Sequence, residues 1–475
     1  MLRKEFDKQI KDCMDRNLEA VKNDKWRNKY HIMAPIGWIN DPNGLCEFNG
    51  EYHCFYQYSP LTPMGGLKFW GQYTSKDLVN WEDRGVALYP DIAEDKDGVY
   101  SGSAFVKDDT VYFFYTGNVK HAGEHDYILT GREQNVILVT SKEGVNFSEK
   151  TVVLRNEDFP SNMSLHVRDP KVWEEDGVYY MVLGARTVDD KGCILLYKSK
   201  DLYNWEFNSI PAGERDDMGY MWECPDTFKL EGKDVFMFSP QGIDAEGYKY
   251  NNVYQSGYAV GNFDEGKKHL ELGDFIEIDR GFDFYAPQTF EDSKNRRIMI
   301  GWMGVPDAVM HKNPTIDNFW QHALTIPREL ILKNDKIYQV PVIELETLRK
   351  GEAYKAEVSL EEGKTLEIFE NNTFELNIDL KNCNDFRVSL REDCVLSFKD
   401  GVFKLELGKS GYGRDMRAVE INSIDSLKIF SDNSILEIFL NDGEEVFTTR
   451  IYNDSIDKCL KLEGTGTALI EKWNL

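Results

Sequence analysis

Three acidic residues, Asp41, Asp169 and Glu223, stand at matching places in an internal repeat, and carboxylates gathered together can act as nucleophile, proton donor and charge stabiliser. Five segments share one plan: a small or acidic residue, usually Pro, an apolar residue, a polar turn, and a second stretch rich in aromatics. Successive segments start 60, 68, 55 and 62 residues apart, the regularity of a repeat architecture. They begin at Asp41, Ser101, Asp169, Cys224 and Ala286.

Equivalent repeats would place these starting residues in one ring, because each would lie at the same end of an inner strand. The residues just before them would form a neighbouring ring, and the three acids would then converge on one channel although they are far apart in sequence. This second ring consists of Asn40, Tyr100, Arg168, Glu223 and Tyr285.

Three neighbouring carboxylates repel one another and shift one another's proton affinity. One acid can stay ionised while another holds a proton, which is the division of labour that glycoside hydrolysis needs. A calcium site is the structural alternative, since carboxylates also suit a hard cation. Arg168 beside Asp169 counts against a metal, because its charge would repel the ion. We therefore expect catalysis here, with no metal and no cofactor.

The surrounding elements are expected to be almost entirely β-strands. Repeats of roughly 60 residues, each long enough for about four strands, predict a five-bladed β-propeller over residues 31–340. An ordinary all-β barrel or sandwich is the alternative. Residues 1–30 contain an amphipathic helical segment, and residues 341–354 are expected to link the propeller to a β-sandwich over residues 355–475. The expected apolar face of the helix is formed by Phe6, Ile10, Met14, Leu18 and Val21.

The charge of the chain excludes several classes of partner. A net charge of −26, from 56 basic and 82 acidic residues, repels phosphate backbones and anionic lipid heads. Nucleic-acid and membrane binding are therefore not expected, and the acidity is explained by solubility. The first twenty residues lack the apolar stretch of a signal peptide, and the 8 cysteines are scattered. Both features favour a cytoplasmic protein with reduced thiols.

Eight motifs follow one another along the chain: W-I-N-D-P-N-G from Trp38, F-Y-Q-Y from Phe55, F-W-G-Q from Phe69, Y-S-G-S-A from Tyr100, R-D-P from Arg168, E-C-P from Glu223, D-F-Y-A-P-Q from Asp283 and L-T-I-P-R-E-L from Leu324. Single tripeptides such as R-D-P are weak signals, but the ordered set is strong and the resemblance it carries runs from about residue 30 to the C-terminus. The set resembles glycoside hydrolase family 32, the invertases and related β-fructofuranosidases. The resemblance implies a five-bladed propeller followed by a β-sandwich, in agreement with the repeat.

The resemblance also implies a role for each acid. Asp41 matches the nucleophile, Glu223 the acid/base and Asp169 the stabiliser of the transition state. It implies retention of configuration, for which the carboxyl groups of Asp41 and Glu223 should lie about 5–5.5 Å apart. Further residues match positions that bind or shape the fructosyl pocket, or are aromatic candidates for it: Trp38, Asn40, Gln57, Trp70, Tyr100, Ser101, Arg168, Tyr285 and Trp302.

The substrate is left open between sucrose and sucrose 6-phosphate, with a lean towards both, because the stretch QHALTIPREL resembles the intracellular branch that acts on the phosphorylated sugar. A phosphate would require nearby cations, for which Lys68, Lys120, His121 and Arg186 are candidates. The alternatives are an exo-hydrolase of fructo-oligosaccharides or inulin, an arabinan- or xylan-cleaving enzyme, and a non-catalytic fructan-binding module. The sandwich is expected to stabilise the propeller or to form a homodimer.

Overall fold

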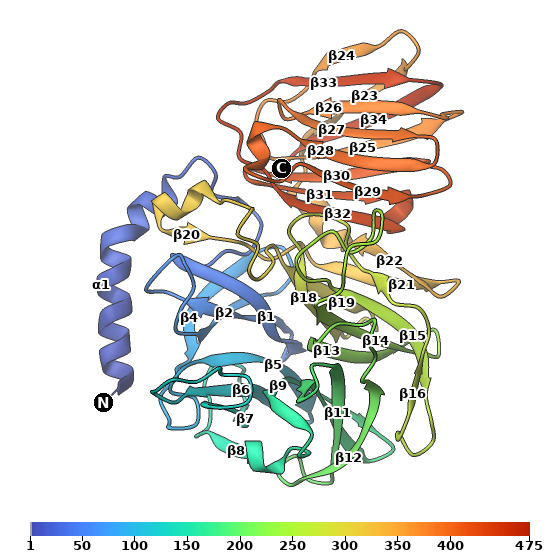
Figure 1. Ribbon diagram of the computed structural model, residues 1–475. Coiled ribbons are helices and arrows are strands. Elements are labelled where there is room, and N and C mark those ends of the chain that lie inside the picture. Colours follow the sequence, from blue (N-terminus) through green and yellow to red (C-terminus); the bar gives the residue numbers. More distant parts are fainter. Residues whose placement is uncertain (1) are drawn as a thin grey trace.

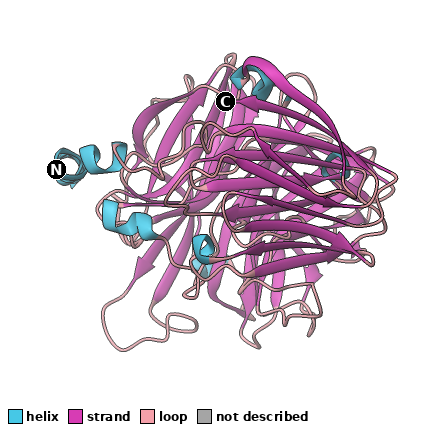
Figure 2. Ribbon diagram, turned by 90° about the horizontal axis from the view of Figure 1, so that it is seen from above, coloured by secondary structure: helices cyan, strands magenta, loops and turns pink. Residues whose placement is uncertain are grey.

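The computed structural model describes residues 2–475, which form a propeller body and a sandwich body with one long helix at the side (Figure 1). The helix α1 (Leu2–Lys22) lies along the propeller and buries Ile10, Cys13 and Val21, while Phe6 packs edge-on against Phe69. Viewed from above, strands make up most of both bodies (Figure 2). The all-β propeller and sandwich predicted from the repeat are confirmed. No helix among residues 2–475 has the length and apolar character needed to span a membrane.

Five sheets form the blades of the propeller. The first blade contains β1 (Gly37–Phe48), β2 (Glu51–Ser59), β3 (Phe69–Ser75) and β4 (Trp81–Leu88), and the second β5 (Val99–Lys107), β6 (Thr110–Lys120), β7 (Arg132–Ser141) and β8 (Thr151–Leu154). The third contains β9 (Met163–Glu175), β10 (Val178–Thr187), β11 (Gly192–Ser199) and β12 (Trp205–Gly213). The fourth contains β13 (Met221–Leu230), β14 (Lys233–Gln241), β15 (Gly257–Phe263), β16 (Leu270–Leu272) and β17 (Ile276–Glu277). The fifth contains β18 (Tyr285–Glu291), β19 (Arg297–Trp302), β21 (Arg328–Lys333) and β22 (Lys336–Pro341).

The inner strands β1, β5, β9, β13 and β18 contact one another in sequence, and β18 returns to β1, so the blades close into a ring. An inner strand has protein on both faces, which is why β1 is buried along most of its length, whereas the outer strand β4 is exposed or half-buried at all but its last residue. A short strand, β20 (Trp320–Gln321), returns from the fifth blade and pairs in parallel with Gly37 and Trp38 of β1.

Each inner strand carries a β-bulge at its repeat position. The register with the second strand of the blade slips between Ile39 and Pro42 in β1, and between Val99 and Gly102 in β5. Comparable slips occur in β9, β13 and β18 at the R-D-P, E-C-P and Y-A-P segments. A bulge turns a side chain away from the regular alternation of a strand, so the same device re-aims one or two residues in every blade.

The second body consists of two six-stranded sheets packed face to face over an apolar core. One sheet contains β23 (Lys350–Ser359), β34 (Thr467–Asn474), β25 (Phe374–Lys381), β30 (Ser426–Asp432), β31 (Ile435–Leu440) and β32 (Glu445–Arg450). The other contains β24 (Lys364–Glu367), β33 (Cys459–Gly464), β26 (Phe386–Leu390), β27 (Cys394–Lys399), β28 (Val402–Leu407) and β29 (Met416–Glu420). Short 3-10 helices occupy Asn156–Asp158, Pro314–Asn318, Ile343–Leu348, Lys409–Gly411 and Asn441–Gly443. The first sandwich strand thus begins inside the segment predicted as a linker.

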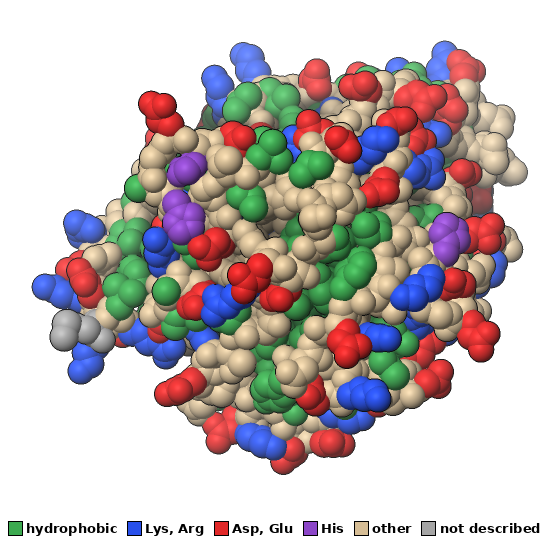
Figure 3. All heavy atoms as spheres, turned by 60° about the horizontal axis from the view of Figure 1, so that its bottom comes forward, with side chains coloured by type: hydrophobic (Ala, Val, Ile, Leu, Met, Phe, Trp, Pro, Cys, Tyr) green, Lys and Arg blue, Asp and Glu red, His purple; other side chains and the backbone are tan. Residues whose placement is uncertain are grey.

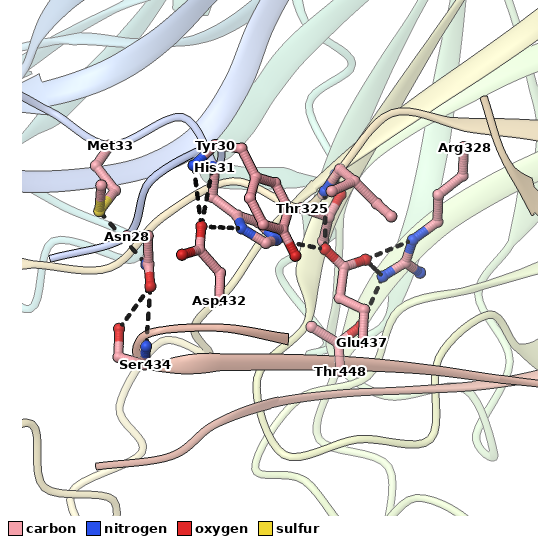
Figure 4. A network of polar contacts seen from close by, with 12 residues as sticks. Asn28, Tyr30, His31, Met33, Thr325, Arg328, Asp432, Ser434, Glu437 and Thr448 are labelled. Atoms are coloured by element: carbon pink, nitrogen blue, oxygen red, sulfur yellow. Dashed lines mark hydrogen bonds and ion pairs between the residues drawn. The ribbon is translucent and has the colours of Figure 1, made fainter. Parts of the chain in front are cut away.

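A buried ionic network joins the two bodies (Figure 4). The Nδ1 atom of His31, which precedes β1, lies 3.0 Å from Asp432 in the sandwich, and its Nε2 atom lies 2.9 Å from Glu437. Arg328 in β21 donates from Nε to Glu437 over 3.0 Å and pairs with Asp279 at 3.0 Å. The side chains of His31, Asp432, Glu437 and Arg328 are 0% exposed, so these contacts are shielded from water and fix one body on the other.

The face seen in Figure 3 carries interspersed acidic and basic side chains around a gathering of hydrophobic ones. Mixed charge of this kind, together with the net charge of −26, favours a well-solvated surface.

Candidate functional site

The Asp41 carboxylate lies in the bulge of β1 and is held by neighbours from two blades. Its Oδ2 accepts a hydrogen bond of 2.5 Å from Ser101, and its Oδ1 accepts one of 3.1 Å from Asn40. Gln57 links these two neighbours, because it accepts from Asn40 at 2.7 Å and donates to Ser101 at 2.6 Å. Burial raises the pKa of Asp41, while these two donors and Lys68 oppose the rise and the Glu223 charge adds to it.

Trp38 and Lys68 complete the surroundings of Asn40. The indole Nε1 of Trp38 donates to Asn40 Oδ1 at 2.9 Å, and the Lys68 ammonium donates to the same oxygen at 2.8 Å. The ammonium also lies 5.1 Å from the centre of the Trp38 ring. Burial lowers the pKa of Lys68 to about 7, and Asp41 opposes that shift. The amide of Asn40 is therefore fixed with its NH2 group towards Asp41 and Gln57.

Asp169 occupies the bulge of β9 with a left-handed backbone, φ 63°. Its N–H donates to the Thr116 hydroxyl at 2.9 Å, and its carboxylate accepts from the N–H of Cys224 at 2.9 Å. The Cys224 thiol lies 3.6 Å from Asp169 and 3.9 Å from Asp41, so both carboxylates border one sulfur atom. Burial raises the pKa of Asp169 to about 7, against the Arg168 charge and with the Glu223 charge.

Glu223 precedes the bulge of β13 and has all of its oxygens engaged. Arg168 donates to Oε1 from Nε at 3.0 Å and from Nη2 at 2.7 Å, a forked charge-assisted contact. Oε2 accepts from Gln241 at 2.6 Å and from the Tyr285 hydroxyl at 2.7 Å. The three acids of the repeat thus meet in one polar cluster, each with its own set of donors.

Two of the aromatic candidates pack beneath or beside this cluster. Trp70 is 0% exposed, donates to the carbonyl of Tyr100 at 3.0 Å and lies within the core between the first two blades. Trp302 is 2% exposed and packs among Trp38, Tyr285 and His322. In this structure neither ring offers an open face to a ligand, whereas Trp38 stays partly exposed.

Several contacts in the site come from residues that the repeat did not single out. Gln241 lies at the end of β14 opposite Met221, and Thr116 lies in β6. His166, two residues before Arg168, accepts from Arg168 at 2.8 Å and lies 3.1 Å from Nη1 of Arg132. The sequence could have predicted His166 as a neighbour of the site, because it lies two residues from Arg168 and alternate residues of a strand share a face. Gln241 could not be predicted in this way, because its partner Glu223 belongs to a different strand.

Models of one protein family match nearly the whole chain. The model described as "Glycosyl hydrolases family 32 N-terminal domain" matches residues 31–341, and the one described as "Glycosyl hydrolases family 32 C terminal" matches residues 344–472. The chain belongs to glycosyl hydrolase family 32. The resemblance drawn from the motifs is thereby confirmed, and the chain is a glycoside hydrolase of the β-fructofuranosidase type.

Individual relatives cover the chain almost completely. Sucrose-6-phosphate hydrolase of Bacillus subtilis (strain 168) is 42% identical over 438 residues, which are 90% of this chain and 89% of the relative. The structure of sucrose-6-phosphate hydrolase from Lactobacillus gasseri matches with a TM-score of 0.88 at 28% identity, covering 98% of this chain and 96% of that chain. The GH32 β-fructofuranosidase of Bombyx mori matches with a TM-score of 0.87 at 31% identity, covering 100% and 99%.

Proposed function

We propose that this protein hydrolyses sucrose 6-phosphate and sucrose at the β-D-fructofuranoside bond, through a covalent fructosyl-enzyme intermediate. The observation that carries the proposal is the meeting of Asp41, Asp169 and Glu223 in one cluster with different donors around each. Sucrose-6-phosphate hydrolases of several bacteria are similar to the chain along most of their length, which supports this choice of substrate. An exo-hydrolase of fructo-oligosaccharides is the second candidate, but no contact in the site favours it.

Asp41 is the nucleophile in this proposal. Its carboxylate attacks the anomeric carbon of the fructosyl unit, and the bond to the leaving sugar breaks. The hydrogen bonds from Ser101 and Asn40 favour the ionised carboxylate, which a nucleophile requires, although burial opposes it. They also hold the side chain in one orientation, so less conformational entropy is lost when the transition state forms.

Glu223 is the general acid and then the general base. A proton on Glu223 must replace one of its present hydrogen bonds, and the Tyr285 hydroxyl permits this because a hydroxyl both donates and accepts. Tyr285 can then accept from the protonated Glu223 while it donates to the carbonyl of Ser239, which lies 3.4 Å away. The proton passes to the glycosidic oxygen, and Glu223 next takes a proton from the water that releases fructose.

Asp169 stabilises the transition state by accepting hydrogen bonds from fructose hydroxyls. Its carboxylate has one backbone donor, the N–H of Cys224, so it retains the capacity to accept more. The strained backbone of Asp169 directs the side chain into the cluster, as is common where strain serves a site.

We also propose that the protein acts in the cytoplasm, because a phosphorylated sugar carries charge and does not cross a lipid bilayer unaided. The homodimer is a separate prediction, which a measurement of the molecular mass of the protein in solution tests.

The test is hydrolysis of sucrose, sucrose 6-phosphate, raffinose and inulin by the parent and by Asp41→Asn and Glu223→Gln. Each variant should lose at least about a thousandfold in kcat, because a nucleophile and a proton donor act as a unit with their neighbours. Fructosyl fluoride separates the two roles. Its leaving group needs no protonation, so Glu223→Gln should regain the first chemical step and Asp41→Asn should not.

The matched control is Glu231→Gln, an exposed position at the hairpin tip of the same blade as Glu223, which should retain parental activity. Near-parental activity in Asp41→Asn would exclude it as the nucleophile. Failure of the parent to release fructose from all four sugars would exclude the proposed function altogether.

A further inference from the structure

Two basic side chains lie opposite each other at the rim of the candidate site. Lys120 ends β6 and Arg132 begins β7, and the two residues are cross-strand partners. The same end of this blade carries Ser101 near the start of β5, where Val99 pairs with Gly117 of β6. Antiparallel strands bring these ends together, so the two cations lie at the end of the blade that holds the Asp41 cluster.

This arrangement of two cations is unfavourable by itself. Like charges directly opposite on neighbouring strands destabilise the pairing. Within residues 2–475 neither side chain forms an ion pair, and the Asp97 carboxylate near Lys120 accepts instead from the Lys120 backbone N–H at 2.8 Å. The Nε atom of Arg132 is buried without a hydrogen-bond partner. Burial lowers the pKa of both side chains. The charge of Arg132 lowers the pKa of Lys120 further, and the charge of Arg168 lowers that of Arg132 further.

The single polar contact of the Arg132 guanidinium does not satisfy it. His166 accepts from Arg168 at Nδ1, so its Nε2 carries the hydrogen and donates to the carbonyl of Tyr127 at 3.0 Å. That nitrogen cannot also accept from Arg132, although the two lie 3.1 Å apart. Burial, with Arg168 and Arg132, lowers the pKa of His166 to about 2, so the ring stays neutral. Arg132 therefore has donors directed at no acceptor.

The position relative to Glu223 indicates which part of a substrate would lie here. Arg132 borders His166, His166 borders Arg168, and Arg168 forks onto Glu223. In the proposed reaction Glu223 protonates the oxygen that joins fructose to the leaving sugar. A group on the leaving sugar, rather than on fructose, is thus the one that approaches the side of Glu223 where these cations lie.

Two of the other cations considered for a phosphate contact a carboxylate, and the third donates to a neutral amide. Arg186 donates two hydrogen bonds to Asp190, and the His121 ring contacts Glu133 at 2.8 Å. Lys68 is bonded to Asn40 within the Asp41 cluster. In a chain of net charge −26, a phosphate needs a local excess of positive charge to be retained, and Lys120 with Arg132 provides it.

We infer that Arg132 and Lys120 form a binding site for the phosphate of sucrose 6-phosphate, with Arg132 the main determinant of preference for the phosphorylated sugar. The inference rests on the proposed function. A guanidinium matches the geometry of a phosphate, and the dianion would relieve the repulsion between the two cations.

The experiment compares kcat/KM for sucrose 6-phosphate and for sucrose in the parent, Arg132→Gln and Lys120→Gln. Loss of one charge-assisted contact should lower the ratio of the two values about ten- to a hundredfold in Arg132→Gln. Lys120→Gln, whose charge is more exposed, should lower it by less, about three- to tenfold. Arg132→Lys should restore part of the ratio because it restores the charge. Glucose 6-phosphate should inhibit the parent more strongly than glucose, and Arg132→Gln should lose that difference.

Arg155→Gln is the matched control, since this arginine lies elsewhere on the same blade and pairs with Glu94, and it should leave the ratio unchanged. An equal loss on both sugars in Arg132→Gln would mean that Arg132 only supports Arg168, and would overturn the inference. An unchanged ratio in both variants would overturn it as well. Failure of the proposed function gives a different result, because then the parent itself cleaves neither sugar.

Discussion

Asp41, Asp169 and Glu223 share one cluster but differ in what surrounds each carboxylate. Asp41 is held by neutral donors, Asp169 by one backbone N–H, and Glu223 by a forked guanidinium. Two neighbouring positions of the repeat have therefore been given three environments, and we infer that the environment divides the roles of nucleophile, stabiliser and acid/base among chemically similar groups.

The pKa shifts predict how activity depends on pH. Burial raises the pKa of Asp41, and it raises that of Asp169 to about 7. Both acids must be ionised to work, so kcat/KM for sucrose should fall as the pH drops below about 7. The fall belongs to the coupled carboxylates and should lie well above the ordinary aspartate value of about 3.9. Sucrose has no group that titrates in this range, so the profile reports the enzyme.

The control for this profile is Asp169→Asn. Its residual activity should keep its plateau to lower pH, because the carboxyl group whose pKa is raised to about 7 is gone. A parental kcat/KM that stays level from pH 7 down to about pH 4.5 would contradict the raised pKa values of Asp41 and Asp169.

At this scale the sequence allowed the acids to be found but not all of their partners. Asp41, Asp169 and Glu223 were visible because the repeat marks the strand position that bulges. Gln241 and Thr116 were not, because they lie on second strands: Gln241 reaches Glu223 across the pairing of two strands in one blade, and Thr116 reaches Asp169 from the neighbouring blade. The burial of Trp70 was equally hidden, since an aromatic residue in an inner strand can face either a ligand or the next blade.

The bulged inner strands are the elements that aim these side chains, and the second strand beside one of them tolerates little extra bulk. Gly184 of β10 pairs with Arg168 of β9. A Cβ atom at Gly184 would lie 2.1 Å from the carbonyl oxygen of Trp222, the residue before Glu223. The absence of a side chain at Gly184 therefore lets the third and fourth blades approach closely enough for Arg168 to reach Glu223.

Gly184→Ala tests this approach. We expect the free energy of unfolding to fall by about 1–3 kcal/mol, the usual range for forced overpacking, and kcat to fall on every substrate. Thermal unfolding and steady-state assays measure the two effects. Gly266→Ala is the control, because its Cβ would meet only the Cγ atom of Lys268, at an ordinary van der Waals distance of 3.5 Å. Parental melting and turnover in Gly184→Ala would show that the blades are not held at this distance.

The blade count was predictable because the spacing, the turns and the aromatic second strands repeat together. The strand β20 was not, since a pairing of two residues leaves no pattern in a sequence. Of its partner residues, Trp38 was noted for the motif that begins there and as a candidate for the fructosyl pocket, and Gly37 was not noted at all.

The two bodies are fixed together by charge that is hidden from water. Hydrogen bonds to Asp432 and Glu437 raise the pKa of His31 to about 9, although burial, the largest single influence, opposes the rise. The same contacts lower the pKa of both acids against the effect of burial. No sequence pattern could predict this network, because its members lie about 400 residues apart.

The raised pKa of His31 predicts that the stability of the protein depends on pH. The stabilisation is complete below about pH 6.5, where the unfolded histidine is also protonated, and it is lost as the pH rises through about 9. The two acids contribute above their own unfolded values, near pH 4, so they do not change within this window. The melting temperature of the parent should therefore decrease between pH 6.5 and pH 9 more than that of His31→Gln.

At pH 6, His31→Gln should be less stable than the parent by about 3 kcal/mol, because two buried acids lose their shared cation. His269→Gln, at an exposed position, should melt like the parent at every pH. If the melting temperatures of the parent and His31→Gln changed with pH by the same amount, the charge on His31 would not contribute to the stability of the protein.

The parallel pairing of β20 with β1 also affects folding of the chain during its synthesis on the ribosome. At about 5–20 residues per second, the nascent β1 waits roughly 15–60 seconds for a partner that follows it by some 280 residues. Until then the backbone groups of Gly37 and Trp38 are open to any extended chain nearby. Translation that is slowed after the first blade should therefore lower the soluble yield, and a chaperone that covers open strand edges should restore it.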